Sequence, residues 1–233
     1  MLTDQELMAM HVRALFTHDA RSRLLFVNEP GGDVPAPRLF VDRTREGNLW
    51  RLRADLPETL AEELEALCAD EPVGQEFQRE PRHVEAYVRL LDGHAPVRRR
   101  WMGPAYHFTR YFEPSRPLLA VTETDAGLLR GGFEELVAEL PDGQPFVALV
   151  EEGRAVSVCR SVRITTAAHE AGVETLPDFR GRGYAKDVVA GWARLVHALG
   201  AVPLYSTSWE NTASQAVAKK LGLTAYGADW HIT

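Results

Sequence analysis

The chain has 233 residues, of which 45% are apolar and 25% charged, values typical of a folded globular protein. Its 33 acidic and 26 basic residues give a net charge of −7, and both halves of the chain are acidic, which excludes a basic nucleic-acid-binding domain. Cys68 and Cys159 lie too far apart in sequence to suggest a disulfide framework or a thiolate metal motif. The first residues show no signal-peptide pattern and no stretch approaches about 18 apolar residues, so we expect a cytoplasmic protein without membrane or nucleic-acid partners.

Residues 1–115 are expected to form an α+β domain. A capping box at Thr3-x-x-Glu6 predicts an opening helix, since each side chain can bond the other residue's backbone N–H. Short apolar runs and apolar residues at helical spacing predict the remaining elements, which are strands at 24–27, 38–41 and 49–52 and helices over 59–68 and 84–91.

Hydrophobic periodicity disappears between His94 and Pro117. This segment is basic and aromatic, with Arg98 to Trp101 as its most basic part. We interpret it as a linker packed between two domains and place the domain boundary near residue 116. Its arginines and aromatic rings would also suit a phosphate or a planar ligand.

Residues 116–233 show a clearer order of elements. Consecutive strands without intervening helices indicate an antiparallel meander, and the strongest amphipathic helix of the chain follows it. The expected elements are strands at 119–121, 146–150, 155–164, 170–175 and 203–206 and helices at 133–140, 184–199 and 212–221.

The loop Arg180-Gly-Arg-Gly-Tyr-Ala185 joins a strand to that strong helix. The first backbone N–H groups of a helix lack partners and carry its positive dipole end, so an anion is favoured there. Gly181 and Gly183 let the backbone approach that anion, and Arg182 or Lys186 adds positive charge. Taken alone, the same loop also fits a plain helix start or a nucleotide site, but it lacks the Gly-Lys-Ser/Thr ending of a P-loop.

Two motifs in this order resemble the GNAT superfamily of N-acetyltransferases: the loop with the preceding Gly172-Val-Glu-Thr175, and the later Asn211-Thr-Ala-Ser214 with Ala218-Lys-Lys-Leu-Gly222. The resemblance covers roughly Leu119 to the end of the chain. It implies a mixed, mainly antiparallel sheet flanked by helices and acetyl-CoA as co-substrate. The element order of residues 1–115 is compatible with a degenerate copy of the same fold.

The resemblance also implies where acetyl-CoA binds. Its pyrophosphate would lie on the amides of the loop, its pantetheine arm beside a strand that separates from its neighbour, and the second motif would hold the arm from the other side. The cofactor-binding residues implied in this way are Val173, Thr175, Arg180, Gly181, Arg182, Gly183, Tyr184, Ala185, Asn211 and Ser214.

Transfer to an amine requires a base, because an aliphatic amine is protonated at neutral pH. Alternation along the strand puts Glu170, Gly172 and Glu174 on one face. Glu174 lies nearer the separation of the strands, beside a glycine that leaves room for a substrate, so it is our first candidate. The alternatives are Glu170 or His169 acting through water, and a purely structural salt bridge for Glu174.

One position departs from the family pattern. Many GNAT enzymes have a tyrosine acid seven residues after the asparagine, where this chain has Ala218. Either the CoA thiol is acidic enough to leave as thiolate without a proton donor, or Ser206, Ser208 or Tyr226 acts as the acid in place of the tyrosine.

We therefore expect an acetyl-CoA-dependent N-acyltransferase acting on an amine of a small molecule or peptide; the alternative is a catalytically inactive acyl-CoA sensor. No metal is expected, because His169-Glu170 lacks the second histidine of a zinc motif. The end of the chain leaves room for one strand after Leu223. Pairing with the N-terminal domain or a second subunit would complete that sheet edge, consistent with a monomer or a homodimer.

Overall fold

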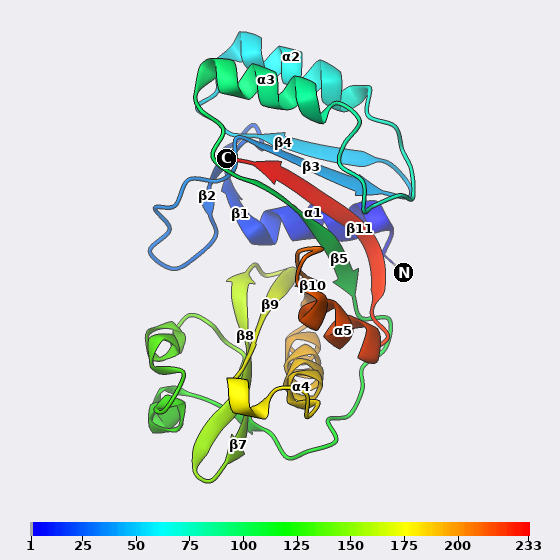
Figure 1. Ribbon diagram of the computed structural model, residues 1–233. Helices are drawn as coiled ribbons and strands as arrows, with labels where there is room; N and C mark the ends of the chain where they lie inside the picture. The colour runs from blue at the N-terminus through cyan, green and yellow to red at the C-terminus, as the bar shows by residue number, and fades with distance from the viewer. Residues whose placement is uncertain (1) are drawn as a thin grey trace. The chain divides into compact units, whose positions relative to one another are not determined.

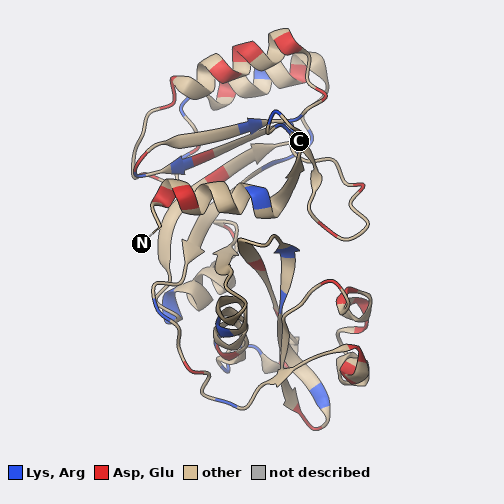
Figure 2. Cartoon of the chain, turned by 180° about the vertical axis from the view of Figure 1, so that it is seen from behind, with Lys and Arg blue, Asp and Glu red and all other residues tan. Residues whose placement is uncertain are grey.

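The computed structural model describes residues 2–233 (Figure 1). The chain divides into two compact units. The first unit contains residues 2–106, 206–212 and 225–233, and the second contains residues 107–205 and 213–224. Both units mix helices and strands, as expected, and acidic and basic residues are interspersed along them (Figure 2).

A four-stranded sheet forms the centre of the first unit, in the order β4-β3-β11-β5. β11 pairs antiparallel with β3, and β3 pairs antiparallel with β4. Helices α2 and α3 cover one face of this sheet and α1 covers the other (Figure 1). The elements are α1 (Asp4–Leu15), β1 (Phe16–His18), β2 (Leu24–Val27), β3 (Leu39–Thr44), β4 (Asn48–Leu52), α2 (Glu58–Ala69), α3 (Val84–His94), β5 (Arg100–His107) and β11 (Thr224–Ile232).

The predicted capping box starts α1. The Thr3 side chain accepts a hydrogen bond from the Glu6 N–H (3.1 Å), and the Thr3 N–H donates to the Glu6 carboxylate (2.8 Å). Every residue of β3 is buried, because the strand is covered on both faces. Its alternation divides the core: Leu39 and Val41 belong to the cluster under α2 and α3, while Phe40 belongs to the cluster under α1.

The segment interpreted as a linker contains the sheet strand β5, which the sequence analysis did not predict. Gly103 and Pro104 interrupt the apolar alternation of this strand and hide it in the sequence. The backbone of 206–212 runs beside it, and the Thr207 N–H donates to the Pro104 carbonyl (3.3 Å). A Cβ atom at Gly103 would collide with the Thr207 carbonyl, so this close approach requires glycine.

The second unit contains the expected meander. Its strands lie in the order β10-β9-β8-β7-β6; the pairs from β6 to β9 are antiparallel, and β10 is parallel to β9. The elements are β6 (Leu119–Ala120), η1 (Glu123–Leu129), η2 (Glu134–Glu139), β7 (Phe146–Glu151), β8 (Arg154–Ile164), β9 (Ala168–Thr175), η3 (Pro177–Phe179), α4 (Tyr184–Ala198), β10 (Val202–Ser206) and α5 (Thr212–Lys220).

The predicted helix at 133–140 is a short 3-10 helix, η2, rather than an α-helix. Gly132 with φ 145° precedes it and Pro141 follows it, so too few residues remain for stable α-helical turns. Phe133, Leu136 and Leu140 are still buried, because their spacing brings them to one side of a 3-10 helix as well.

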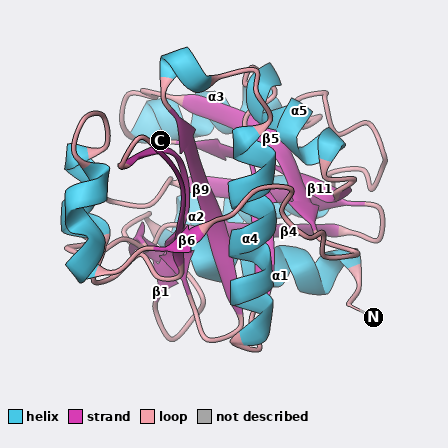
Figure 3. Ribbon diagram, turned by 90° about the horizontal axis from the view of Figure 1, so that it is seen from below, coloured by secondary structure: helices cyan, strands magenta, loops and turns pink. Residues whose placement is uncertain are grey.

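The sheet of the second unit has different cover on its two faces. η1 and η2 pack on one face through a cluster that includes Val158. On the other face α4 packs on β7, β8 and β9 (Figure 3). Trp192 of α4 is fully buried, and its indole N–H donates to the Ser161 hydroxyl of β8 (3.0 Å).

Candidate functional site

The loop before α4 has the backbone geometry of an anion site. Gly183 precedes the helix in the left-handed conformation (φ 83°), and Gly181 is left-handed too (φ 78°). A Cβ atom at either position would have nothing within 4 Å, so both glycines are required by their backbone angles and not by crowding. The first N–H groups of α4 follow at once, where the positive end of the helix dipole favours an anion.

Two arginines of this loop bond to backbone carbonyls of the preceding segment. The Arg180 side chain donates to the Thr175 carbonyl (3.1 Å) and the Arg182 side chain to the Asp178 carbonyl (3.0 Å). Arg182 also lies over the ring of Phe179, at 4.9 Å from its centroid. These contacts hold positive charge beside the helix N-terminus, where it strengthens the attraction for a phosphate group.

Arg116 and Asp187 belong to the same site, although the sequence analysis did not find them. Asp187 is buried in the first turn of α4 and accepts hydrogen bonds from the Ser115 N–H (2.9 Å) and from Arg116 (2.5 Å). Arg116 also donates to the Arg182 carbonyl of the loop (3.3 Å). Burial alone would raise the pKa of Asp187, but these donors lower it below its usual value. The pair joins residues about 70 positions apart, and no local pattern reveals such a contact.

β9 and β10 pair only where they begin. Their register consists of Val202 with Ala168, Pro203 with His169 and Leu204 with Glu170. β9 continues to Thr175, so Val173 and Thr175 lie beyond this pairing, next to the loop. On the other side of β9 the register with β8 shifts between Ser161 and Arg163, close to where the β10 pairing ends. The strand separation expected from the resemblance is therefore present, and it leaves one edge of β9 for a ligand's amide groups.

Glu174 forms a salt bridge with a buried arginine. Arg160 of β8 contacts the Glu174 carboxylate at 2.8 Å and the Glu139 carboxylate of η2 at 2.5 Å. Burial would lower the pKa of Arg160, but its hydrogen bonds to the two carboxylates raise the pKa above the usual value. The Glu174 side chain remains 42% exposed.

The space beside Gly172 is not open for a substrate, contrary to our expectation. A Cβ atom there would overlap the Val162 side chain, which the register shift of β8 places against the glycine. Gly172 is required for packing in this structure.

The two alternative bases are more enclosed. Glu170 is only 2% exposed, at the end of the β9–β10 pairing. His169 is 7% exposed, and its Nδ1 lies 2.9 Å from the Ser161 hydroxyl. Burial lowers the pKa of His169, because it disfavours the protonated form of the imidazole.

The residues of the second motif fall in different units. Ser208 and Asn211 lie in 206–212, which belongs to the first unit, and the Asn211 N–H donates to the Ser208 hydroxyl (3.2 Å). Ser214 lies on α5 in the second unit, with its hydroxyl 2.7 Å from that of Tyr205. Ala218, where the family pattern has a tyrosine, is buried in α5. The roles of these residues in binding or catalysis stay predictions.

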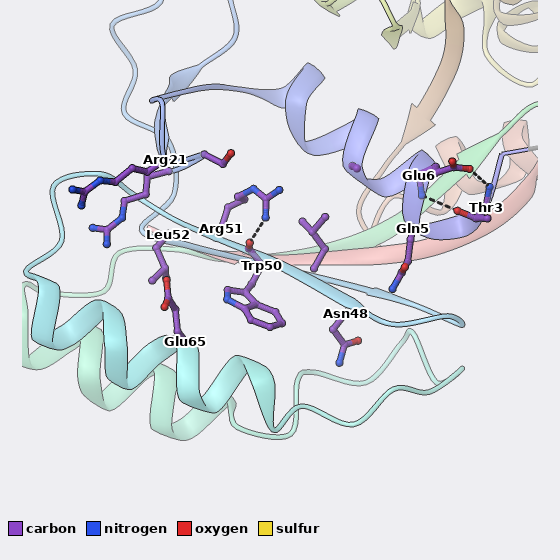
Figure 4. Close-up of a pocket in the computed structure, with 13 residues that line it drawn as sticks. Thr3, Gln5, Glu6, Arg21, Asn48, Trp50, Arg51, Leu52 and Glu65 are labelled. Carbon is purple, nitrogen blue, oxygen red and sulfur yellow. Dashed lines mark hydrogen bonds between the residues drawn. The ribbon is translucent and has the colours of Figure 1, made fainter.

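The cavity drawn in Figure 4 belongs to the first unit and contains none of the predicted site residues. Its volume is about 750 Å³, and it follows the residues of β4, including Trp50 and Arg51. Across residues 2–233 the structure contains no group of three or more His, Cys, Asp or Glu side chains arranged to hold a metal ion. No helix in the same range is long and apolar enough to cross a membrane.

Comparison with known proteins agrees with the resemblance seen in the motifs. Residues 142–228 match the GNAT acetyltransferase family. Among curated proteins no match was found. The structure of a Drosophila protein matches this chain with a TM-score of 0.52 and 13% identity, and the match covers 98% of this chain and 86% of that one. This similarity supports the fold alone.

Two bacterial structures are also similar. A GCN5-related N-acetyltransferase-like protein from Streptococcus suis has 18% identity, a TM-score of 0.49 and 85% coverage of both chains. An acetyltransferase of the GNAT family from Novosphingobium aromaticivorans has 21% identity and a TM-score of 0.49; the match covers 58% of this chain and 65% of that one.

Proposed function

We propose that the chain is an acetyl-CoA-dependent N-acyltransferase that acetylates an amine of a small molecule or peptide, because residues 142–228 match the GNAT acetyltransferase family. The observation that carries the proposal is the combination of strand and loop in the second unit. β9 extends beyond its pairing with β10 and leads directly into a left-handed glycine loop at the N-terminus of α4. A long ligand with amide groups at one end and a pyrophosphate at the other fits such a surface.

In this proposal the loop residues 180–185 bind the pyrophosphate through backbone N–H groups, and Arg116 and Arg182 add charge. Val173 and Thr175 supply backbone groups to the pantetheine amides, with Asn211 and Ser214 as further contacts. Acetyl-CoA contributes an acetyl thioester, which is reactive toward amines. A backbone N–H on β9 would stabilise the developing oxyanion, a type of contact worth about 3–4 kcal/mol in other acyl transfers.

The proposed chemistry is a direct transfer. The amine nitrogen bonds to the thioester carbonyl carbon, the C–S bond breaks, the amine proton passes to Glu174, and CoA leaves as thiolate or takes a proton from Ser208. Glu174 keeps the role of first candidate because its carboxylate is partly exposed on the strand that the thioester would follow. Glu170 is the second candidate.

Two observations favour a second function, that of an acyl-CoA sensor without catalysis. Glu174 is engaged by Arg160, and Ala218 replaces the acid found in many relatives. Such a protein would keep the loop and the strand edge and lose turnover.

A single assay separates the two functions. The protein is mixed with acetyl-CoA and a panel of primary amines, including polyamines, amino sugars and lysine peptides, while thiol release and CoA affinity are measured. Amine-dependent thiol release supports the enzyme. Tight CoA binding with only slow background hydrolysis for every amine supports the sensor, and absence of CoA binding refutes both.

A further inference from the structure

Arg160 is shared unequally between two carboxylates. Glu139 takes the Nε edge of the guanidinium with two bonds, to Nε (2.5 Å) and Nη2 (3.2 Å). Glu174 takes Nη1 with one bond, through Oε1 (2.8 Å). The Arg160 side chain is 9% exposed, whereas Glu139 and Glu174 are 41% and 42% exposed. The cluster therefore has one cation, two anions and a net negative charge.

The unequal sharing has a chemical consequence. An arginine paired with a single carboxylate tends to bind it in a bidentate manner, which stabilises the ionised form and weakens the carboxylate as a base. Here Glu139 occupies the bidentate edge, so Glu174 receives one bond and part of the charge.

We propose that Glu139 is a positioning residue that keeps Glu174 competent as a proton acceptor by occupying the chelating edge of Arg160. This inference rests on the proposed function, because it concerns the candidate base of that reaction. Arg160 fixes the direction of the Glu174 carboxylate, and Glu139 limits how strongly Arg160 holds it. Neither Glu139 nor Arg160 needs to touch the substrate.

The charged groups around Glu174 come from several elements. Arg160 on β8 contacts it directly, and Glu139 on η2 acts through Arg160. On β9 itself, Glu170 lies on the same face as Glu174. Beyond the end of β9, the Arg180 side chain donates to the Thr175 carbonyl. Among these groups Glu139 is the one whose removal frees two guanidinium donors for Glu174.

The direct test measures the titration of Glu174 by NMR of ¹³C-labelled glutamate side chains in the full-length protein. The Glu174 resonance is identified by its loss in Glu174→Gln. In Glu139→Gln we expect the titration midpoint of Glu174 to fall by about 0.5–1 pH unit. Glu135→Gln removes an exposed acid from the same short helix η2 and should leave the midpoint unchanged. An unchanged midpoint in folded Glu139→Gln overturns the proposal.

Glu139→Asp provides a second test if Glu139→Gln does not fold. It keeps the charge with a shorter reach, so a midpoint between those of wild type and Glu139→Gln is expected. With an amine that supports turnover, the acid limb of the pH–rate profile should move in the same direction in Glu139→Gln, with kcat lower by about three- to tenfold and CoA affinity unchanged. A structural salt bridge alone would lower thermal stability without moving this limb.

The readouts separate failure of the inference from failure of the proposed function. Normal turnover in Glu174→Gln removes the proposed base, whatever the midpoint does. Loss of turnover in Glu174→Gln together with an unmoved midpoint in Glu139→Gln keeps the base and removes the role of Glu139.

Discussion

Asp42 of β3 and Asp229 of β11 lie directly opposite each other across the central strand pair of the first unit, and both are buried. The Asp229 carboxylate lies 3.1 Å from Nε2 of the buried His11 of α1. Both carboxylate oxygens of Asp42 are buried without a hydrogen-bond partner among the described residues. Burial raises the pKa of Asp42 well above its usual value, Asp229 raises it further, and His11 and Arg51 lower it.

The raised pKa of buried Asp42 predicts that the free energy of unfolding falls as pH rises. Asp42 binds its proton more tightly in the folded than in the unfolded chain, so folding takes up a proton above the unfolded pKa of about 4. The contribution of Asp42 to stability is complete below that pH and is lost as pH rises toward the folded pKa. Asp42→Asn should therefore stabilise the protein by about 1–3 kcal/mol at pH 8 and much less at pH 4.5, measured by urea unfolding. Asp33→Asn, at an exposed position, should show no such pH-dependent gain.

The second prediction concerns the anion loop. Gly183→Val should lower CoA affinity at least tenfold in calorimetry, because a β-branched residue disfavours the left-handed backbone that starts α4. Gly153→Val is a matched control: Gly153 has φ 76°, open space around its Cβ position, and lies in the turn between β7 and β8. It should cost similar stability and leave CoA binding intact. Equal affinity in both variants means that the loop is not the pyrophosphate site.

The third prediction concerns Asp187, which fixes Arg116 beside the loop. Asp187 has a lowered pKa in the folded chain, so its contribution is present above the unfolded pKa and is lost as pH falls through the folded value. Asp187→Asn should cost about 1–2 kcal/mol at pH 7, a difference that shrinks below about pH 4. It should also weaken CoA binding severalfold. The exposed Asp178→Asn, nearby in η3, serves as control.

The fourth prediction concerns the base. Glu174→Gln should lower kcat by about 10²–10⁴-fold with little change in CoA affinity. Normal turnover in this variant and loss in Glu170→Gln would assign the role to Glu170, at the end of the β9–β10 pairing.

The sequence predicted those parts of the site that are local in the chain. The glycine loop, the start of α4 and the meander that precedes them each have a signature within a few residues, so their positions agree with the structure to within one or two residues. The limits of this approach appear where a contact joins distant segments. Arg116 with Asp187, and Arg160 with Glu139 and Glu174, are ion pairs between separate elements, and the sequence offers only unpaired charges there.

Backbone pairing between distant segments was equally hidden. β5 has Gly103 and Pro104 in place of alternating apolar residues, because the neighbouring chain at Thr207 approaches too closely for a side chain. The helix predicted at 133–140 shows the opposite error: an apolar spacing of three and four residues fits both kinds of helix, and only the flanking Gly132 and Pro141 limit its length.

β11 affects the order in which the protein can be assembled during synthesis. It lies between β3 and β5 in the sheet of the first unit, yet it comes from the opposite end of the chain. The ribosome synthesises β3 and β5 long before residues 225–233. The edges of β3 and β5 that pair with β11 therefore stay unpaired while the second unit is synthesised. Such edges attract other strands, and a chaperone that covers them during this interval would protect the chain from aggregation. Removing residues 225–233 should therefore unfold the first unit, the one to which most of the N-terminal half belongs.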